Sequence, residues 1–272
     1  MQDLQGKVAV ITGAGSGIGE GIARAAASAG MQVVIADIDM VKAQQVADDL
    51  GDCAFAVRVD VSDLESVEAL RDACLAKFGA VHLLCNNAGV RIGALMKDAD
   101  IKDWQYQINV NLYGVIHGLK AFLPLLVEQG EGHVVNTASI GGLIAGPPEG
   151  LYSTTKFAVV GLSESLLMEV AEHGVGVSVL CPGLVDTRLI QQSLDVRPGT
   201  LDPGIDHHQP APDTASGIAP LTVGEQVIDA VREGGFYIIT HDDYRDIIAM
   251  RHQGILDALD SHAARYGSTS AG

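Results

Sequence analysis

The sequence predicts a doubly wound α/β fold, in which helices cover both faces of one seven-stranded parallel sheet. Of the 272 residues, 47% are hydrophobic but only 4% are aromatic, a composition typical of Val-, Ile-, Leu- and Ala-rich strands buried on both faces. Short β-branched runs alternate in regular order with longer stretches whose apolar residues recur every three to four positions. Such alternation favours right-handed crossovers between parallel strands.

Seven short apolar runs are the predicted strands. They lie at residues 8–11, 33–35, 55–59, 82–85, 133–137, 175–180 and 236–239. The predicted helices occupy residues 18–28, 41–50, 67–78, about 104–129, 152–173 and a last stretch that ends at about Ala264. Because no internal repeat or linker interrupts this order, residues 1–272 are expected to form a single domain.

One segment, residues 184–221, breaks the alternation. It holds five prolines and the pair His207 and His208, with little apolar periodicity. An irregular stretch of this length is typical of a lid, a binding loop or a disordered segment. Since it leaves the carboxyl end of the predicted strand 175–180, where ligands of such sheets bind, we expect a substrate lid; a mobile surface loop is the alternative. We expect His207 and His208 to be solvated.

The net charge argues against several classes of partner. Asp and Glu number 34 against 17 Lys and Arg, which gives a net charge of -17, and a field of this sign repels nucleic acid and anionic membranes. Asp3 stands where a signal peptide has basic residues, and we find no run of about 20 apolar residues. The sequence therefore predicts a cytoplasmic protein with no nucleic-acid partner and no membrane partner.

The cysteines form no recognisable metal or redox motif. Cys53, Cys74, Cys85 and Cys181 are far apart, with no CxxC pair and no histidine cluster at ligand spacing. We expect free thiols that pack as small hydrophobic side chains in a reducing compartment, and no metal site.

A glycine-rich turn, Thr12-Gly13-Ala14-Gly15-Ser16-Gly17-Ile18-Gly19, joins the first predicted strand to the first predicted helix. Glycines let the backbone turn sharply and approach a ligand, while free amides and the helix dipole favour a pyrophosphate. Asp37 ends the second strand, 18 residues beyond Gly19, where a carboxylate accepts hydrogen bonds from ribose hydroxyls and repels a 2′-phosphate. We therefore expect NAD(H) rather than NADP(H); alternatively, Asp37 or Asp39 only caps the next helix.

Three further polar residues are candidates for one catalytic site. Tyr152 and Lys156 lie four residues apart, which puts both on one face of the predicted helix. Ser139 comes just after the predicted strand 133–137, at the carboxyl end of the sheet where ligands bind.

With these motifs the chain resembles the short-chain dehydrogenases/reductases from residue 7 to residue 187. The resemblance rests, in family order, on the glycine turn, Asp60, Asn86-Asn87-Ala88-Gly89, Asn111 in Asn111-Leu112-Tyr113-Gly114, Ser139, Tyr152 with Lys156, and Pro182-Gly183-Leu184-Val185-Asp186-Thr187. It implies a single Rossmann-like domain and an enzyme that moves a hydride between a substrate carbon and a nicotinamide.

The resemblance also implies a role for each catalytic residue. Tyr152 is the general acid/base, and the charge of Lys156 lowers its pKa from the ordinary value of about 10. Lys156 also binds the nicotinamide ribose, and Ser139 hydrogen-bonds the substrate oxygen. Asn111 interrupts its helix so that water connects Lys156 to solvent.

The cofactor is expected, on the same resemblance, to lie across the carboxyl ends of the strands. The residues expected to contact it are Gly13, Ser16, Gly17, Ile18, Gly19, Asp37, Ile38, Asp60, Val61, Asn87, Ala88, Gly89, Tyr152, Lys156, Pro182, Gly183, Val185 and Thr187. Alternatively, Asn86 and Asn87 only stabilise the turn at the centre of the sheet. Cys181 is expected to pack in the core and not to take part in the reaction.

We expect an NAD(H)-dependent alcohol dehydrogenase or ketoreductase that interconverts a secondary alcohol and a ketone. The enzymatic alternative is a carbonyl or 3-oxoacyl-thioester reductase that prefers NADPH. A sugar-nucleotide epimerase of the extended type is disfavoured, because those proteins usually have a different glycine spacing and a longer C-terminal domain. The non-enzymatic alternative is a dinucleotide-binding regulator, which would not require Asn111, Ser139, Tyr152 and Lys156 together.

Two regions depart from the family's pattern. Many members end on a strand followed by Asp-Gly-Gly, whereas here Gly234 and Gly235 precede residues 236–241 and a further helical stretch. This region often forms the subunit interface, and a homodimer or homotetramer is expected without assuming the common geometry. The long segment 184–221 motivates the expectation of a bulky or apolar substrate.

Overall fold

The computed structural model describes residues 1–195 and 214–267. Much of the predicted lid, including His207 and His208, therefore lies outside the described residues. Contacts divide the chain into one unit, Met1–Thr240, and a second unit, His241–Gly272, so the expectation of one domain over 1–272 stays a prediction. The second unit contains helix α9 (Arg245–Tyr266), which has no buried residue.

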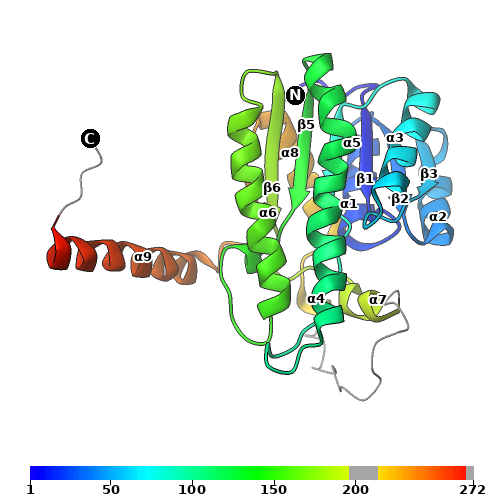
Figure 1. Cartoon of the computed structure of the whole chain (residues 1–272). Coiled ribbons are helices and arrows are strands. Elements are labelled where there is room, and N and C mark those ends of the chain that lie inside the picture. The colour runs from blue at the N-terminus through cyan, green and yellow to red at the C-terminus, as the bar shows by residue number, and fades with distance from the viewer. Residues whose placement is uncertain (196–213, 268–272) are drawn as a thin grey trace. The chain divides into compact units, whose positions relative to one another are not determined.

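The first unit is built on a seven-stranded parallel sheet with the strand order β3-β2-β1-β4-β5-β6-β7 (Figure 1). The strands are β1 (Val8–Thr12), β2 (Gln32–Asp37), β3 (Ala54–Arg58), β4 (Leu83–Asn86), β5 (Gly132–Thr137), β6 (Val175–Cys181) and β7 (Tyr237–Ile239). Each predicted run coincides with a strand to within two residues, which confirms the predicted fold class. The strand order reverses between β1 and β4, and sheets of this kind bind ligands in the crevice at that point.

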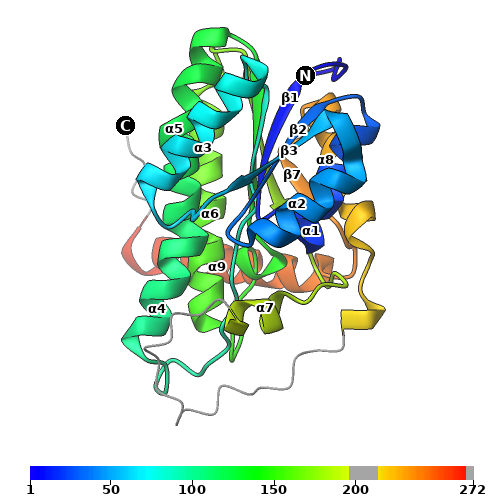
Figure 2. The same cartoon turned by 90° about the vertical axis from the view of Figure 1, so that its right-hand side faces the viewer.

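Helices cover both faces of the sheet (Figure 2). One face carries α1 (Gly17–Ser28), α2 (Met40–Leu50) and α8 (Pro220–Glu233), and the other carries α3 (Leu64–Phe78), α5 (Gly114–Gln129) and α6 (Gly150–Glu169). The shorter elements are α4 (Ile101–Ile108), α7 (Leu189–Asp195), one π-helical turn η2 (Asn109–Tyr113) and the 3-10 turns η1 (Gly51–Cys53), η3 (Ile140–Gly142) and η4 (Thr214–Ser216).

Successive strand residues pack in two different cores, because strand side chains alternate between the faces. Ile11 packs with Ile22 of α1 on one face. Val10, its neighbour in β1, packs with Phe122 of α5 on the other. Both cores are almost entirely aliphatic, as the low aromatic content predicts.

The helical stretch 101–129 is formed by α4, the π turn η2 and α5, where the sequence predicts one helix. Among the described residues it is the one segment long and apolar enough to cross a membrane, judged by length and composition alone. Val115, Phe122 and Leu126 of this stretch are buried in the core of the unit. Packing against the sheet therefore accounts for much of its apolar character.

A buried histidine sits near the start of β5. His133 Nε2 lies 2.8 Å from Ser178 Oγ, and that hydroxyl donates to the carbonyl oxygen of Gly235 at 2.5 Å. Because a serine has one hydroxyl proton, His133 must donate from Nε2, which leaves Nδ1 without its proton. Nδ1 is buried without a hydrogen-bond partner among the described residues, and burial lowers the pKa of His133 to about 4.

We expect His133 to make the protein less stable in acid. The unfolded chain binds this proton near pH 6.5, whereas the folded chain does so only near pH 4, so stability is lost as the pH falls from 6.5 to 4. The loss at pH 4 is of order 3 kcal/mol. Urea unfolding between pH 4 and 7 measures it: His133→Asn should flatten this pH dependence, whereas substitution of the exposed His252 by Asn should leave it. Equal pH dependence of His133→Asn and wild type would contradict the expectation.

All four cysteines are free thiols. Cys74, Cys85 and Cys181 are buried, and burial raises the pKa of each thiol, to about 12 for Cys74 and Cys181. Cys53 is half-buried, and its Sγ donates to the carbonyl oxygen of Leu50 at 3.4 Å.

Candidate active site

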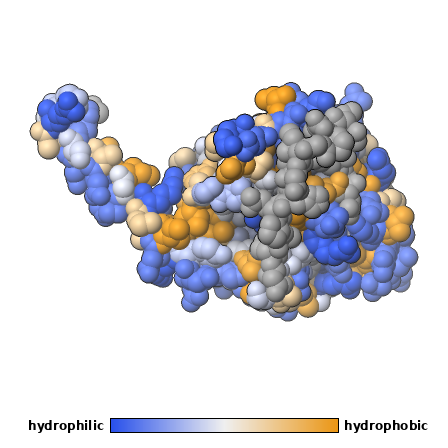
Figure 3. Space-filling model, turned by 90° about the horizontal axis from the view of Figure 1, so that it is seen from below, coloured by the Kyte–Doolittle hydropathy of each residue, from blue (hydrophilic) through white to orange (hydrophobic). Residues whose placement is uncertain are grey.

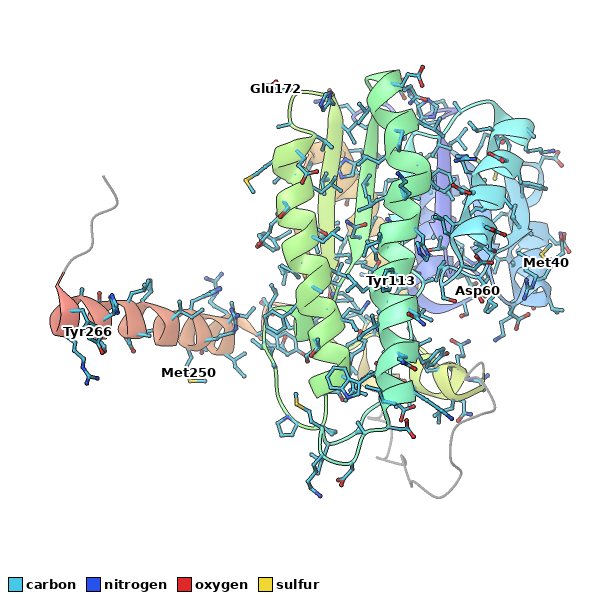
Figure 4. The ribbon with its side chains drawn as sticks, viewed as in Figure 1. Met40, Asp60, Tyr113, Glu172, Met250 and Tyr266 are labelled. Carbon is cyan, nitrogen blue, oxygen red and sulfur yellow. The ribbon has the colours of Figure 1, made fainter. Side chains whose placement is uncertain are left out.

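A cavity of about 580 Å³ lies along the carboxyl ends of the strands. Its wall contains residues that end or follow six of the strands, from Gly13 after β1 to Pro182 after β6. Asp60, after β3, lies toward this end of the sheet, and Glu172 lies at the opposite end (Figure 4). Seen from below, apolar side chains on this end lie in patches between hydrophilic ones (Figure 3). The volume is within the range of about 300–1,000 Å³ that is usual for ligand sites.

The glycine turn forms one wall of the cavity and requires glycine for two different reasons. Gly13 and Gly17 have φ values of +65° and +56°, in the left-handed region that favours glycine. Gly19 has a different constraint, because a Cβ there would lie 2.2 Å from the carbonyl oxygen of Gly13. The turn is thereby folded tightly on itself, and its glycines let a ligand approach the backbone closely.

The first turn of α1 has amides available for an anion. Ser16 is the N-cap residue, but its hydroxyl donates to Gln192 Oε1 at 3.3 Å and makes no capping bond to α1. The first amides of a helix have no partner within the helix, and phosphates bind at such positions. Ser16, Gly17, Ile18 and Gly19 all line the cavity, so the residues of this turn fit the pyrophosphate of a dinucleotide.

Asp37 is placed to contact a ribose. Its Oδ2 accepts the amide proton of Gly15 at 2.8 Å, and its Oδ1 accepts that of Asp39 at 2.9 Å. Each carboxylate oxygen keeps a further acceptor position, and the side chain lines the cavity. Asp39 caps α2 by accepting from the amides of Val41 and Lys42. The capping role therefore falls to Asp39.

Three further residues that are expected to contact the cofactor also line the cavity. Ile38, Asp60 and Val61 are part of its wall. Asp60 Oδ1 accepts hydrogen bonds from the amide and the hydroxyl of Ser62, at 3.0 and 2.7 Å. These bonds fix the loop after β3, so that Asp60 has a defined position beside the cavity.

The two asparagines after β4 differ in position. Asn87 lines the cavity, and its amide group donates to the carbonyl oxygen of Thr12 at 3.0 Å. The backbone amides of Asn87 and Ala88 both donate to the Thr12 hydroxyl, at 3.0 and 3.1 Å. Asn86 is buried and donates to Asn136 Oδ1 at 2.9 Å. Asn86 thus stabilises the centre of the sheet, whereas Asn87 holds β4 to β1 and borders the cavity; Ala88 and Gly89 line it too.

Tyr152 and Lys156 both reach the cavity from α6. Lys156 Nζ donates to the carbonyl oxygen of Thr137 at 2.8 Å and lies 5.5 Å from the centre of the Tyr152 ring. The Ser139 hydroxyl acts to lower the pKa of Tyr152, and Ser139 Oγ accepts the amide proton of Gly141 at 3.0 Å. Ser139 is buried next to Tyr152 and is not part of the cavity wall.

The pKa values of Tyr152 and Lys156 differ from what the sequence predicts. Burial raises the pKa of Tyr152, against the lowering effects of the Ser139 hydroxyl and of the positive charge of Arg91. Burial also lowers the pKa of Lys156 to about 8. The expectation that Lys156 lowers the pKa of Tyr152 leaves out this burial, and it misses the second cation, Arg91.

Asn111 lies in the π turn η2 and holds three segments together. Its side-chain amide donates to the carbonyl oxygen of Val90 at 2.8 Å and to the Thr155 hydroxyl at 3.1 Å. Its Oδ1 accepts the amide proton of Val90 at 2.7 Å. A Cβ placed on Gly89 would lie 3.4 Å from Asn111 Oδ1 and 3.5 Å from Lys156 Nζ, so the two side chains flank Gly89. The water connection to solvent stays a prediction.

Only some residues of the segment after β6 line the cavity. Pro182 and Thr187 line the cavity, whereas Gly183 and Val185 do not. The amide of Gly183 donates to the Thr240 hydroxyl at 3.2 Å, and Val185 forms a parallel bridge with Ile218. Direct cofactor contact by Gly183 and Val185 stays a prediction.

Sequence reasoning missed one face of α4 and all of α7. Lys102, Gln105, Tyr106 and Asn109 line the cavity at helical spacing, a pattern that the sequence does contain. Leu189, Gln192 and Ser193 line it from α7, which is too short for apolar periodicity to reveal. In its described part, the predicted lid thus places a helix in the cavity wall; its opening and closing stay a prediction.

Comparisons with known proteins agree with this geometry. The family model for short-chain dehydrogenases matches residues 7–197. The chain is 40% identical over 198 residues to a protein named putative oxidoreductase SadH from Mycobacterium tuberculosis, over 71% of this chain and 72% of that protein.

Two solved structures are similar in fold. A short-chain dehydrogenase/reductase from Burkholderia phymatum in complex with NAD has a TM-score of 0.87 and 37% identity, with 100% of both chains covered. A 3-ketoacyl-(acyl-carrier-protein) reductase from Brucella melitensis complexed with NADH has a TM-score of 0.74 and 30% identity, over 87% of this chain and 96% of that one. The extent of the family match and the shared sheet establish that the chain belongs to the short-chain dehydrogenase/reductase family and is an oxidoreductase.

Proposed function

We propose that the protein is an NAD(H)-dependent oxidoreductase that interconverts a secondary alcohol and a ketone. The observation that carries the proposal is a single cavity lined both by the glycine turn with Asp37 and by Tyr152 with Lys156. A dinucleotide-binding regulator would need only the first pair of features. The half-buried Tyr152 and the buried Lys156 beside them therefore favour an enzyme.

Tyr152 transfers the proton of the reaction. In the oxidative direction its phenolate oxygen accepts the hydroxyl proton of the alcohol, and in the reductive direction its hydroxyl protonates the ketone oxygen. Bound NAD(H) supplies the hydride acceptor or donor. Ser139 hydrogen-bonds the substrate oxygen, the Lys156 ammonium stabilises the phenolate, and Asn111 positions the turn that borders Lys156.

We expect NADH to be preferred to NADPH by about 100-fold in kcat/KM, because the Asp37 carboxylate repels a 2′-phosphate. The positive charge of Lys42, which also lines this part of the cavity, is countered by Asp39 at 3.3 Å. Initial rates with the two cofactors measure the preference. Asp37→Asn should reduce it at least about 10-fold, whereas Asp63→Asn, at the cap of α3 and outside the cavity, should leave it. Equal wild-type rates would contradict NAD(H) dependence.

A panel of secondary alcohols and ketones, followed by NADH absorbance, tests the reaction itself. The similarity to the Brucella reductase favours a second candidate, reduction of a 3-oxoacyl thioester, and the panel includes such a thioester. Cofactor binding without turnover of any compound would favour a regulator. The bulky or apolar substrate, the homo-oligomer and the cytoplasmic location stay predictions, and a preference for the shortest alcohols would count against the first.

A further inference from the structure

An ion pair that has no role in the proposed chemistry lies beside Tyr152. Arg91 Nε donates to Glu149 Oε2 at 2.9 Å and Arg91 Nη2 to Glu149 Oε1 at 2.5 Å. The guanidinium therefore engages both carboxylate oxygens side by side, the geometry in which an Arg pair is strongest and most directional. The exposed fractions of the two side chains are 26% and 25%, so water screens the pair only in part.

Both partners are attached directly to the catalytic elements. Glu149 is the N-cap residue of α6, three residues before Tyr152. Arg91 is the second residue after Gly89 in the loop that follows β4, and its amide donates to Ser193 Oγ of α7 at 2.9 Å. The pair thus ties the start of α6 to the loop beside the cavity and to the helix in its wall.

The guanidinium also packs on the tyrosine itself. Arg91 Cζ lies 5.7 Å from the centre of the Tyr152 ring, within the distance of about 6 Å at which a cation interacts with an aromatic face. Although burial opposes its charge, the bond to Glu149 raises the pKa of Arg91, so the guanidinium stays charged. Tyr152 therefore has two cations close to its ring, Arg91 and Lys156.

We propose that Arg91 and Glu149 are a positioning pair, in which Arg91 fixes the Tyr152 ring and the two opposite charges together set the pH range in which Tyr152 exchanges protons. The proposal rests on the proposed role of Tyr152 as acid/base. The groups that face Tyr152 are Ser139 after β5, Cys181 of β6, Lys156 of α6, Arg91 and Glu149. Of these, Arg91 favours the phenolate and Glu149 opposes it. Removal of the Arg91 charge therefore disfavours the phenolate, and removal of the Glu149 charge favours it.

Alcohol oxidation needs the phenolate, so kcat/KM rises with pH as Tyr152 loses its proton. Arg91→Gln should move the midpoint of this rise to higher pH by about one unit, the size usual for a charge within about 6 Å. Glu149→Gln should move it to lower pH by a similar amount. The double variant should have a midpoint near that of the wild type. Arg91→Lys keeps the charge but not the two-pronged bond, so its kcat should fall about 10-fold with little change in midpoint.

The opposite directions separate this role from a structural one, which would lower activity without moving the midpoint up in one variant and down in the other. Midpoints of Arg91→Gln and Glu149→Gln that stay at the wild-type value, or move in the same direction, overturn the proposal. Calorimetric binding of NAD checks that each variant retains its cofactor site. If Arg91→Gln does not fold, Glu149→Gln and Arg91→Lys carry the test. Retention of the pH-dependent rise in Tyr152→Phe would instead refute the proposed function.

Discussion

Replacing Tyr152 by phenylalanine is expected to lower kcat for alcohol oxidation about 10³-fold or more, because the proton acceptor is lost. The ring keeps its place between the neighbours that fix it, since Arg91 and Lys156 contact the aromatic face rather than the hydroxyl. The affinity for NAD should therefore stay within about twofold of the wild type. Steady-state rates of NADH formation and calorimetric titration with NAD measure the two quantities.

A matched control for this variant is Tyr113→Phe. Tyr113 is exposed and its ring lies 5.8 Å from that of His117, in the same helical stretch as Asn111, so loss of its hydroxyl should leave kcat unchanged. Full turnover by Tyr152→Phe would refute the assignment of the acid/base. A parallel loss in both variants would show that the effect is not specific to Tyr152.

Gly19→Ala is expected to weaken NAD binding at least about 100-fold and to lower the free energy of unfolding by about 1–3 kcal/mol. The added Cβ would lie 2.2 Å from the carbonyl oxygen of Gly13 and 2.6 Å from Asn87 Nδ2. The first of these atoms belongs to the backbone, and the second is held by its hydrogen bond to the carbonyl oxygen of Thr12, so the turn must open to admit the methyl group. Calorimetric titration with NAD and chemical denaturation measure both effects.

The control for this change is Gly161→Ala in the middle of α6. A Cβ at Gly161 meets no atom within 4 Å, and alanine should stabilise the helix there by about 0.5–1 kcal/mol. Opposite signs of the stability change at the two glycines are the expected result. NAD binding by Gly19→Ala with wild-type affinity would show that the turn does not hold the cofactor.

The sheet could be predicted because its strands read as short apolar runs, and the central strands β1, β4 and β5 are buried along their whole length. The edge strand β7 keeps an apolar run although only Ile238 in it is buried. The helices between the strands follow from apolar spacing. The interruption of the helix at Asn111 is implied by the family resemblance and not by apolar periodicity, and the structure forms it as a π turn. Helix α7 could not be predicted for another reason, because its seven residues lie in a proline-rich segment.

The site residues that belong to recognisable motifs could be predicted from the sequence. Gly13, Asp37 and Tyr152 all line the cavity, as their positions after or beyond strands predict. The pair Arg91 and Glu149 could not be predicted, because its members are 58 residues apart and only the fold brings them together. The direction of the Tyr152 pKa shift also depends on burial, which a sequence does not specify for a single side chain.

The burial of the cysteines has a practical consequence for labelling. Only the thiolate of a cysteine reacts readily with maleimides or oxidants, and burial keeps Cys74, Cys85 and Cys181 protonated. Cys53, half-buried in the 3-10 turn before β3, is the most accessible of the four. A fluorophore on Cys53 would sit before β3, at the end of that strand opposite the cavity, and could be attached without removal of any other cysteine.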